Sequence, residues 1–153
     1  MGEMTMDRIF NSVFEVSLRM VLLLSLSEGN PLSLDRVAAY DFITINSRYF
    51  GYSDAVLHGE NEFGLSEYAS RRHLAQQALR ELVLDGAVRV AYGTMGFCYS
   101  ITESGIKMAQ GFKSEYAMKY LQLARKTISK LVSVDEAEII ALVNSVPSLS
   151  LKG

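Results

Sequence analysis

The sequence has very little of the chemistry that disulfide frameworks and metal sites require. It contains one cysteine, Cys98, and two histidines, His58 and His73, in 153 residues. A single cysteine excludes an intramolecular disulfide and a cysteine-rich zinc site, so we expect Cys98 to pack in the core of a cytoplasmic protein. His58 lies near Glu60 and Glu62, but this set in an irregular stretch is more typical of a solvated loop than of a metal or acid–base site.

Motifs that identify enzymes and membrane proteins are also missing. Residues 93–96 read Gly-Thr-Met-Gly but lack the lysine and the following helix of a phosphate-binding loop, and no nucleophile motif is present. The apolar run at residues 20–24 is far shorter than the roughly 20 residues that span a bilayer. Glu15 and Arg19 interrupt the apolar stretch after Arg8, which argues against a signal peptide. We therefore expect a protein that is not an enzyme, has no catalytic, cofactor-binding or metal-binding residues, and does not enter a membrane.

Neither sign of charge dominates the chain, whose formal net charge is −2. The first 65 residues carry nine acidic and four basic side chains, whereas the remainder carries eight acidic and eleven basic ones. A protein that binds DNA strongly by itself usually carries more positive charge, because much of that affinity comes from contacts with phosphates. The charge balance therefore favours a role other than tight, independent DNA binding.

A helix followed by a two-stranded hairpin is the clearest pattern in the sequence. Apolar side chains recur at helical spacing over residues 66–85, and Gly86 is suited to end that helix. Two runs within residues 87–101 alternate apolar with smaller or polar side chains and flank a glycine-rich turn, which predicts paired strands. Thr102 can cap the next helix. This order is typical of the second half of a winged helix-turn-helix, with residues 87–101 as the wing.

Further helices are predicted on both sides of this unit. Ser33 precedes an apolar-periodic stretch and fits a helix cap, and two C-terminal helices are predicted at residues 114–145. The expected fold is mainly α with a small β-hairpin, a winged helix-turn-helix with additional N- and C-terminal helices. It forms a single domain at residues 10–146, between a lead-in at residues 1–9 and a tail at residues 147–153.

An irregular insert separates the second and third predicted helices. Residues 46–65 contain three glycines and four aromatic residues. The corresponding link in a compact helix-turn-helix is about 3–4 residues, and connections above roughly 12–15 residues are usually functional or carry structure of their own. We interpret the insert as part of a surface that contacts a partner.

The third helix carries most of the side chains that could contact a nucleic acid or a partner protein. At about 100° per residue, its outward face holds Ser70, His73, Gln77 and Glu81. This face is polar with one acid, rather than basic. The candidate contact residues are Ser70, Arg71, Arg72, His73 and Gln77 on the helix and Arg89 on the wing.

Two of these candidates have a competing structural interpretation. The helical projection places Arg72 near the core stripe and Arg71 on its flank. We favour an internal salt bridge for them, for example with Asp41 or Glu67, over a contact with nucleic acid. Arg89 could touch a phosphate backbone, although isolated surface charges are usually only solvated.

Several stretches resemble a known bacterial family in order and spacing. They are residues 10–19, residues 34–42, Arg71-Arg72, residues 82–86 and residues 99–102. Together they resemble the middle component, second type, of the ABC-three component systems, over about residues 8–146. The resemblance implies a winged-helix protein encoded beside an SMC-like or RecN-like ABC ATPase and a third, variable component. It also implies a role in conflict with phage or other foreign DNA, and it supplies no catalytic residues.

Two functions follow from these observations. The first is a non-enzymatic adaptor that docks onto the ABC ATPase and touches DNA only within the assembly. The second is a dimeric transcriptional regulator that reads DNA with Ser70, His73, Gln77 and Arg89. A regulator should bind duplex DNA alone with an affinity that falls steeply with salt, whereas an adaptor should co-purify with its ATPase.

Overall fold

Six helices and three short strands form the part of the chain that the computed structural model describes, residues 13–53, 68–94 and 96–145. In chain order they are α2 (Val13–Leu26), β1 (Leu32–Ser33), α3 (Leu34–Ile45), α4 (Tyr68–Leu84), β2 (Val88–Gly93), β3 (Gly96–Ile101), α5 (Glu103–Gly111), α6 (Glu115–Leu131) and α7 (Glu136–Asn144). The predicted lead-in, the tail, His58 and most of the insert lie outside the described residues.

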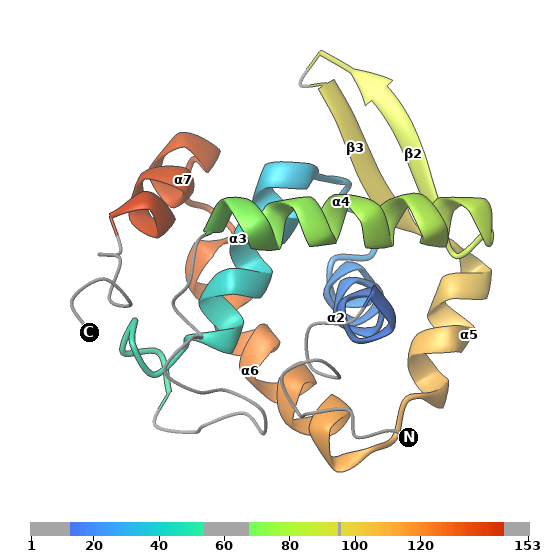
Figure 1. The fold of residues 1–153 in the computed structure, drawn as a ribbon, viewed down its shortest axis with the longest axis horizontal. Helices are drawn as coiled ribbons and strands as arrows, with labels where there is room; N and C mark the ends of the chain where they lie inside the picture. The colour runs from blue at the N-terminus through green and yellow to red at the C-terminus, as the bar shows by residue number, and fades with distance from the viewer. Residues whose placement is uncertain (1–12, 54–67, 95, 146–153) are drawn as a thin grey trace.

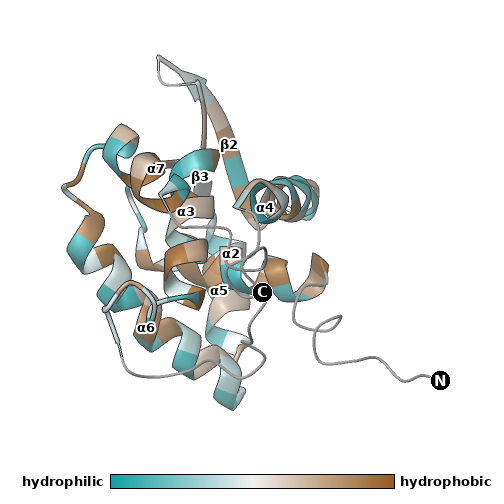
Figure 2. Cartoon of the chain, turned by 60° about the vertical axis from the view of Figure 1, so that its left-hand side comes forward, coloured by the Kyte–Doolittle hydropathy of each residue, from teal (hydrophilic) through white to brown (hydrophobic). Residues whose placement is uncertain are grey.

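Helix α2 is the centre of the structure. It packs against α3, α4, α5 and α6, and in Figure 1 it is seen nearly end-on below α4. Most of its length is buried, including Met20, Val21 and Leu23 at 0% exposure. A helix that is apolar nearly all round must be surrounded by other elements, because no face of it is suited to water. Both hydrophilic and hydrophobic residues colour α4 and α6 in Figure 2, as expected for helices with only one face in the core.

The end of α4 sets the direction of the wing. Gly86 has a φ of +82°, a left-handed conformation that glycine adopts without steric cost. The Gly86 amide donates to the carbonyl of Val83 at 3.1 Å, and the Ala87 amide donates to that of Leu82 at 2.9 Å. This pair of hydrogen bonds is the Schellman motif, which satisfies the last carbonyls of the helix and turns the chain into β2.

The predicted hairpin is present and belongs to a slightly larger sheet. Strands β2 and β3 pair antiparallel, with Val88 opposite Ile101 and Tyr92 opposite Phe97. Strand β1 pairs with the other edge of β3, so the strand order is β1-β3-β2. A strand of two residues has no recognisable sequence pattern, which is why only the hairpin could be predicted. The mainly helical fold with a small antiparallel sheet agrees with the expected fold class and is compatible with a winged helix that has extra helices.

Serine and threonine side chains cap the start of three helices, two of them, at Ser33 and Thr102, as predicted. The Ser33, Thr102 and Ser114 hydroxyls accept hydrogen bonds from backbone amides three residues later, at 3.0, 3.0 and 3.1 Å. Helix α7 then folds back against α3, where Ser33 donates to the Glu136 carboxylate at 2.6 Å and Arg36 donates to the Val134 carbonyl at 2.7 Å. These contacts connect the C-terminal helices to the first half of the domain.

Candidate partner-docking surface

One face of the wing is apolar along its whole length. Because side chains alternate across a strand, Val88, Val90 and Tyr92 of β2 share a face with the residues paired to them on β3. These partners are Ile101, Tyr99 and Phe97. Burial declines steadily from the base to the tip: Val88 is 2% exposed, Val90 is 38% exposed and Tyr92 is 75% exposed. The inner end of this face therefore belongs to the core, and its outer end meets solvent.

An aromatic pair occupies the exposed end of this face. The rings of Tyr92 and Phe97 meet edge to face with centroids 4.9 Å apart, and Phe97 is 60% exposed. An aromatic side chain can bury about 150–250 Å², so the two exposed fractions leave roughly 200–340 Å² of aromatic surface in solvent. Apolar patches of this order on small proteins are often functional. Figure 1 shows that the hairpin projects away from the helices, so the pair is accessible to a partner.

The outward face of α4 is polar and nearly neutral, as the sequence predicts. Ser70, His73, Gln77 and Glu81 are all exposed. The structure therefore brings Ser70, His73 and Gln77 together on one accessible helix face. Arg89 lies on β2 on the opposite face of the hairpin from the aromatic pair, and it is also exposed.

Arg71 is not part of this surface, and its predicted place on the flank of the core stripe is wrong. It is 8% exposed and lies on the same side of α4 as the buried residues Ala75, Ala78 and Leu82. The projection at about 100° per residue had placed Arg72 nearer the core than Arg71. An arginine is rarely buried unless a charged partner lies nearby. Asp41 supplies such a group here, since its negative charge acts on Arg71.

Arg72 forms an ion pair at the side of α4, with a different acid from those expected. Its Nε donates to the Asp35 carboxylate of α3 at 2.5 Å, and both side chains are about 40% exposed (40% and 38%). Tyr68 also reaches α3, because its hydroxyl donates to the Asp35 carbonyl at 3.2 Å. Glu67 lies outside the described residues. Arg72 is therefore used to hold α4 against α3, which leaves it less available for a phosphate.

A buried polar cluster fixes the helices beneath this surface. Arg19 of α2 donates from Nε to the Asp41 carboxylate of α3 at 2.8 Å, and the Tyr120 hydroxyl of α6 donates to the same carboxylate at 2.6 Å. Arg19 also contacts the Tyr116 hydroxyl at 3.4 Å. The side chains of Arg19 and Asp41 are 1% and 5% exposed. The Asp41 carboxylate therefore joins α2, α3 and α6 through hydrogen bonds, and its charge also acts on Arg71 of α4.

The titration of the cluster follows from its burial. Burial raises the pKa of Tyr120 well above 10.0, and the negative charge of Asp41 raises it further. Burial also raises the pKa of Tyr116 to about 12. Burial and then the charge of Arg19 lower the pKa of Arg71. Burial alone would lower the pKa of Arg19, but Asp41 and the tyrosines more than offset this and raise it. The two tyrosines therefore keep their protons and Arg19 keeps its charge, which suits a structural role.

Sequence reasoning missed the residues that most clearly mark this surface. Tyr92 and Phe97 were assigned to strands from their alternation, but the alternation does not say where the core ends along a hairpin. Asp35 was not singled out as the partner of Arg72, because that pairing depends on how α3 crosses α4.

Within the described ranges no group of three or more histidine, cysteine, aspartate or glutamate residues could hold a metal ion. In the same ranges no helix has the length and apolar character needed to cross a bilayer.

The fold and the surface together define a small helical domain with a projecting hairpin, compatible with a winged helix, whose accessible face is aromatic and polar. The family described as ABC-three component (ABC-3C) system Middle Component 2 matches residues 9–152. The chain belongs to this family, as the resemblance in its sequence predicted. Neither a curated protein nor a solved structure matches the chain significantly.

Proposed function

We propose that this chain is a non-enzymatic adaptor that docks onto the ABC ATPase of its three-component system through the wing and the outer face of α4. Membership of a middle-component family implies other components with which the chain works. The observation that carries the proposal is the exposed aromatic pair at the wing tip, Tyr92 and Phe97. Exposed aromatic side chains are enriched where proteins bind proteins, because they bury a large area at little entropic cost.

The size of the aromatic patch supports a larger partner over a second copy of the chain. A symmetric contact between two wing tips would bury roughly 400–700 Å² of aromatic surface, twice the exposed area of one pair. Stable interfaces usually bury about 1,200–2,000 Å² in total. A partner that receives the hairpin can add contacts along α4, whereas a wing-to-wing dimer reaches only the tips.

The charges of α4 and the wing also favour a protein partner. The exposed charged residues from α4 to the end of β3 are Arg80, Glu81, Asp85 and Arg89, which is two of each sign. Arg71 is buried and Arg72 is paired with Asp35. A surface without excess positive charge gains little from releasing the counterions of DNA, so independent duplex binding should be weak.

Binding to the purified ABC ATPase of the same system tests the proposal. We expect a complex by calorimetry, and we expect the double variant Tyr92→Ser/Phe97→Ser to weaken it at least about 30-fold, as for an aromatic hot spot. Met118→Ser is the matched control, because Met118 is 53% exposed but lies on α6. Absence of binding by the native chain would overturn the proposal, and equal binding by the wing variant would remove the wing from it.

A second candidate is a dimeric DNA-binding regulator. The observation that favours it is the exposure of Ser70, His73 and Gln77 on one face of α4, with Arg89 accessible on the wing. If this candidate is correct, the purified chain should bind a labelled duplex, with an affinity that falls by orders of magnitude between 50 and about 200 mM salt. The adaptor proposal predicts weak duplex binding by the chain alone.

A role of the whole system against phage can be tested by comparing the plating efficiency of phage on cells that carry the system with the native chain or with the wing variant.

A further inference from the structure

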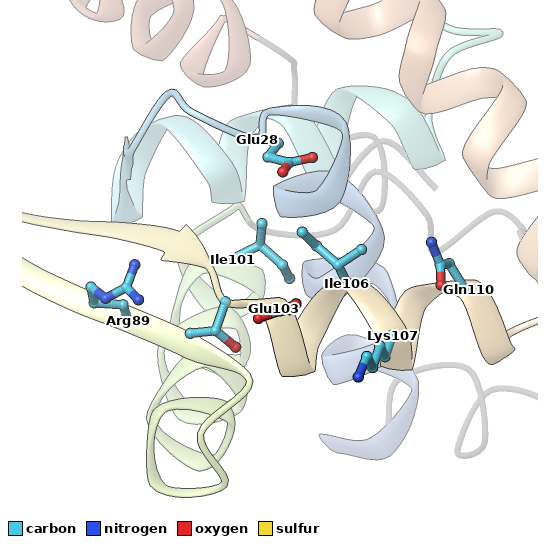
Figure 3. A pocket seen from close by; sticks show the side chains of 8 residues that line it. Glu28, Arg89, Ile101, Glu103, Ile106, Lys107 and Gln110 are labelled. Atoms are coloured by element: carbon cyan, nitrogen blue, oxygen red, sulfur yellow. The ribbon is translucent and has the colours of Figure 1, made fainter.

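A concave feature lies at the base of the wing, away from the aromatic tip. This groove has a volume of about 530 Å³ and is bounded by the turn after α2, the start of β2, the end of β3 and helix α5. Its lining includes Glu28, Arg89, Ile101, Glu103, Ile106 and Lys107. Figure 3 shows Ile101 and Ile106 in the middle of the groove, with Glu28 on one side, Arg89 at the end toward the wing and Gln110 at the opposite end. We call it the α5 groove.

The residues around Ile101 at the floor of the α5 groove are held to the start of the wing by hydrogen bonds and close packing. Thr102 donates from its hydroxyl to the Gly86 carbonyl at 2.7 Å, and the Thr102 amide donates to the Ala87 carbonyl at 3.1 Å. At Gly105 a Cβ atom would collide with the Ala87 carbonyl oxygen, so α5 sits as close to the start of the wing as glycine permits. The groove is therefore a fixed feature of the fold.

The charges around the floor are not used to hold the fold together. Within the described part of the chain, Glu28, Arg89, Glu103 and Lys107 form no ion pair. All four are exposed, whereas Ile101 is buried and Ile106 is half-buried. Glu103, Ile106 and Lys107 lie three and four residues apart, so α5 presents an acid, an apolar side chain and a base on one helix face. The groove thus offers two charges of each sign around an apolar centre.

We infer that the α5 groove binds a segment of the ABC ATPase in which an apolar side chain is flanked by an acidic residue and a basic residue. This inference rests on the proposed adaptor function. The apolar side chain would cover Ile101 and Ile106, its acidic neighbour would meet Arg89 or Lys107, and its basic neighbour would meet Glu28 or Glu103. Charges of both signs at one site fix the direction of a bound segment and exclude segments with the wrong pattern.

Other ligand classes fit the α5 groove less well. A phosphate-rich ligand would face the carboxylates of Glu28 and Glu103, which repel it. A small molecule usually binds where most of its surface is enclosed, whereas the charged walls of this groove are exposed to solvent. A polypeptide supplies an apolar group and charges of both signs within a few residues, so its chemistry complements the lining.

Charge reversal measures whether the groove contributes to the complex. Binding of the native chain to the purified ABC ATPase is compared with binding of Arg89→Glu, Lys107→Glu and Glu28→Lys. Lys113→Glu is the matched control, because Lys113 is also exposed and follows α5 but does not line the groove. We expect each groove variant to bind at least about tenfold more weakly, since like charges brought together at an interface are costly, and we expect the control to bind like the native chain. Circular dichroism and the thermal midpoint check that each variant folds.

A photoreactive benzoylphenylalanine at position 110 or 113 identifies what occupies the groove. We expect crosslinking to the ATPase from position 110, through a peptide that carries an apolar residue between charges of opposite sign, and much less from position 113. If the groove variants bind normally while the wing variant does not, the groove inference is wrong and the adaptor function stands. A native chain that does not bind the ATPase overturns the adaptor function itself. Crosslinking to a second copy of this chain, or a groove-dependent change in its sedimentation, would also overturn the inference.

Discussion

Replacing Asp41 with asparagine should remove much of the stability of this domain, although the side chain hardly changes in size. Asp41 is the carboxylate that binds both Arg19 and Tyr120 in the described core, and its charge also acts on Arg71. The asparagine side chain would keep the shape and some hydrogen bonding, but two buried arginines would lose their nearest negative charge. An ionised side chain that is left unpaired in the interior is costly, because water no longer solvates it.

The magnitude follows from the burial of the pair. Removing one partner of a buried ion pair typically costs about 3–5 kcal/mol, whereas an exposed pair contributes about 0–1 kcal/mol. Arg19 and Asp41 are 1% and 5% exposed, and Arg72 and Asp35 are 40% and 38% exposed. Asp35→Asn is therefore a matched control, with the same substitution on the same helix and an arginine partner in both cases. We expect losses of about 3–5 kcal/mol for Asp41→Asn and at most about 1 kcal/mol for Asp35→Asn.

Urea unfolding followed by circular dichroism measures the difference. With an m value near 2 kcal/mol/M, the midpoint should fall by about 1.5–2.5 M for Asp41→Asn and by no more than about 0.5 M for Asp35→Asn. Arg19→Met should cost less than Asp41→Asn, because Asp41 would keep the Tyr120 hydroxyl and the charge of Arg71. Equal losses for the two asparagine variants would refute the reasoning, since burial would then not control the strength of the pair.

Three further outcomes follow from single positions. Gly105→Ala should cost about 1–3 kcal/mol of stability, because the new Cβ would collide with the Ala87 carbonyl oxygen. Gly111→Ala in the same helix should instead stabilise the protein by about 0.5–1 kcal/mol, because its Cβ would meet open space. Thermal unfolding of the two variants measures this difference. Ser114→Ala should cost about 1 kcal/mol in the same assay, because it removes the cap of α6. Burial raises the pKa of Tyr120 above 10.0, so the folded protein keeps that proton longer than the unfolded chain and should lose stability as the pH rises above about 10. Tyr120→Phe should make that decline shallower, and an unchanged slope between about pH 8 and 11 would contradict the assignment.

The adaptor proposal and the stability predictions concern different layers of the molecule. The cluster around Asp41 joins helices beneath α4, so its loss should mainly lower the free energy of unfolding and should affect docking only through that loss of stability. The wing pair and the α5 groove lie at the surface, so their variants should keep the native unfolding free energy within about 0.5 kcal/mol, apart from the mutual contact of the two rings. Measuring stability and ATPase binding on the same variants therefore separates structural residues from docking residues.

Local patterns in the sequence were sufficient to locate most elements. The caps at Ser33 and Thr102 were predicted because a hydroxyl that accepts a hydrogen bond from an amide three residues later is a local interaction. The hairpin was predicted because glycine turns and alternation are local as well. Strand β1 was not predicted, because two residues become a strand only when β3 lies beside them.

The sequence by itself determined the helices, the hairpin and the family, since each depends on neighbours along the chain or on the order of short motifs. Only the tertiary structure decided that Arg71 turns inward and Arg72 pairs with Asp35, because burial of an arginine depends on a carboxylate brought from another helix. It also decided that Tyr92 and Phe97 reach solvent, because the same alternation continues past the point where the helices stop covering the wing. Spacing specifies which face a side chain occupies, and packing specifies what that face meets.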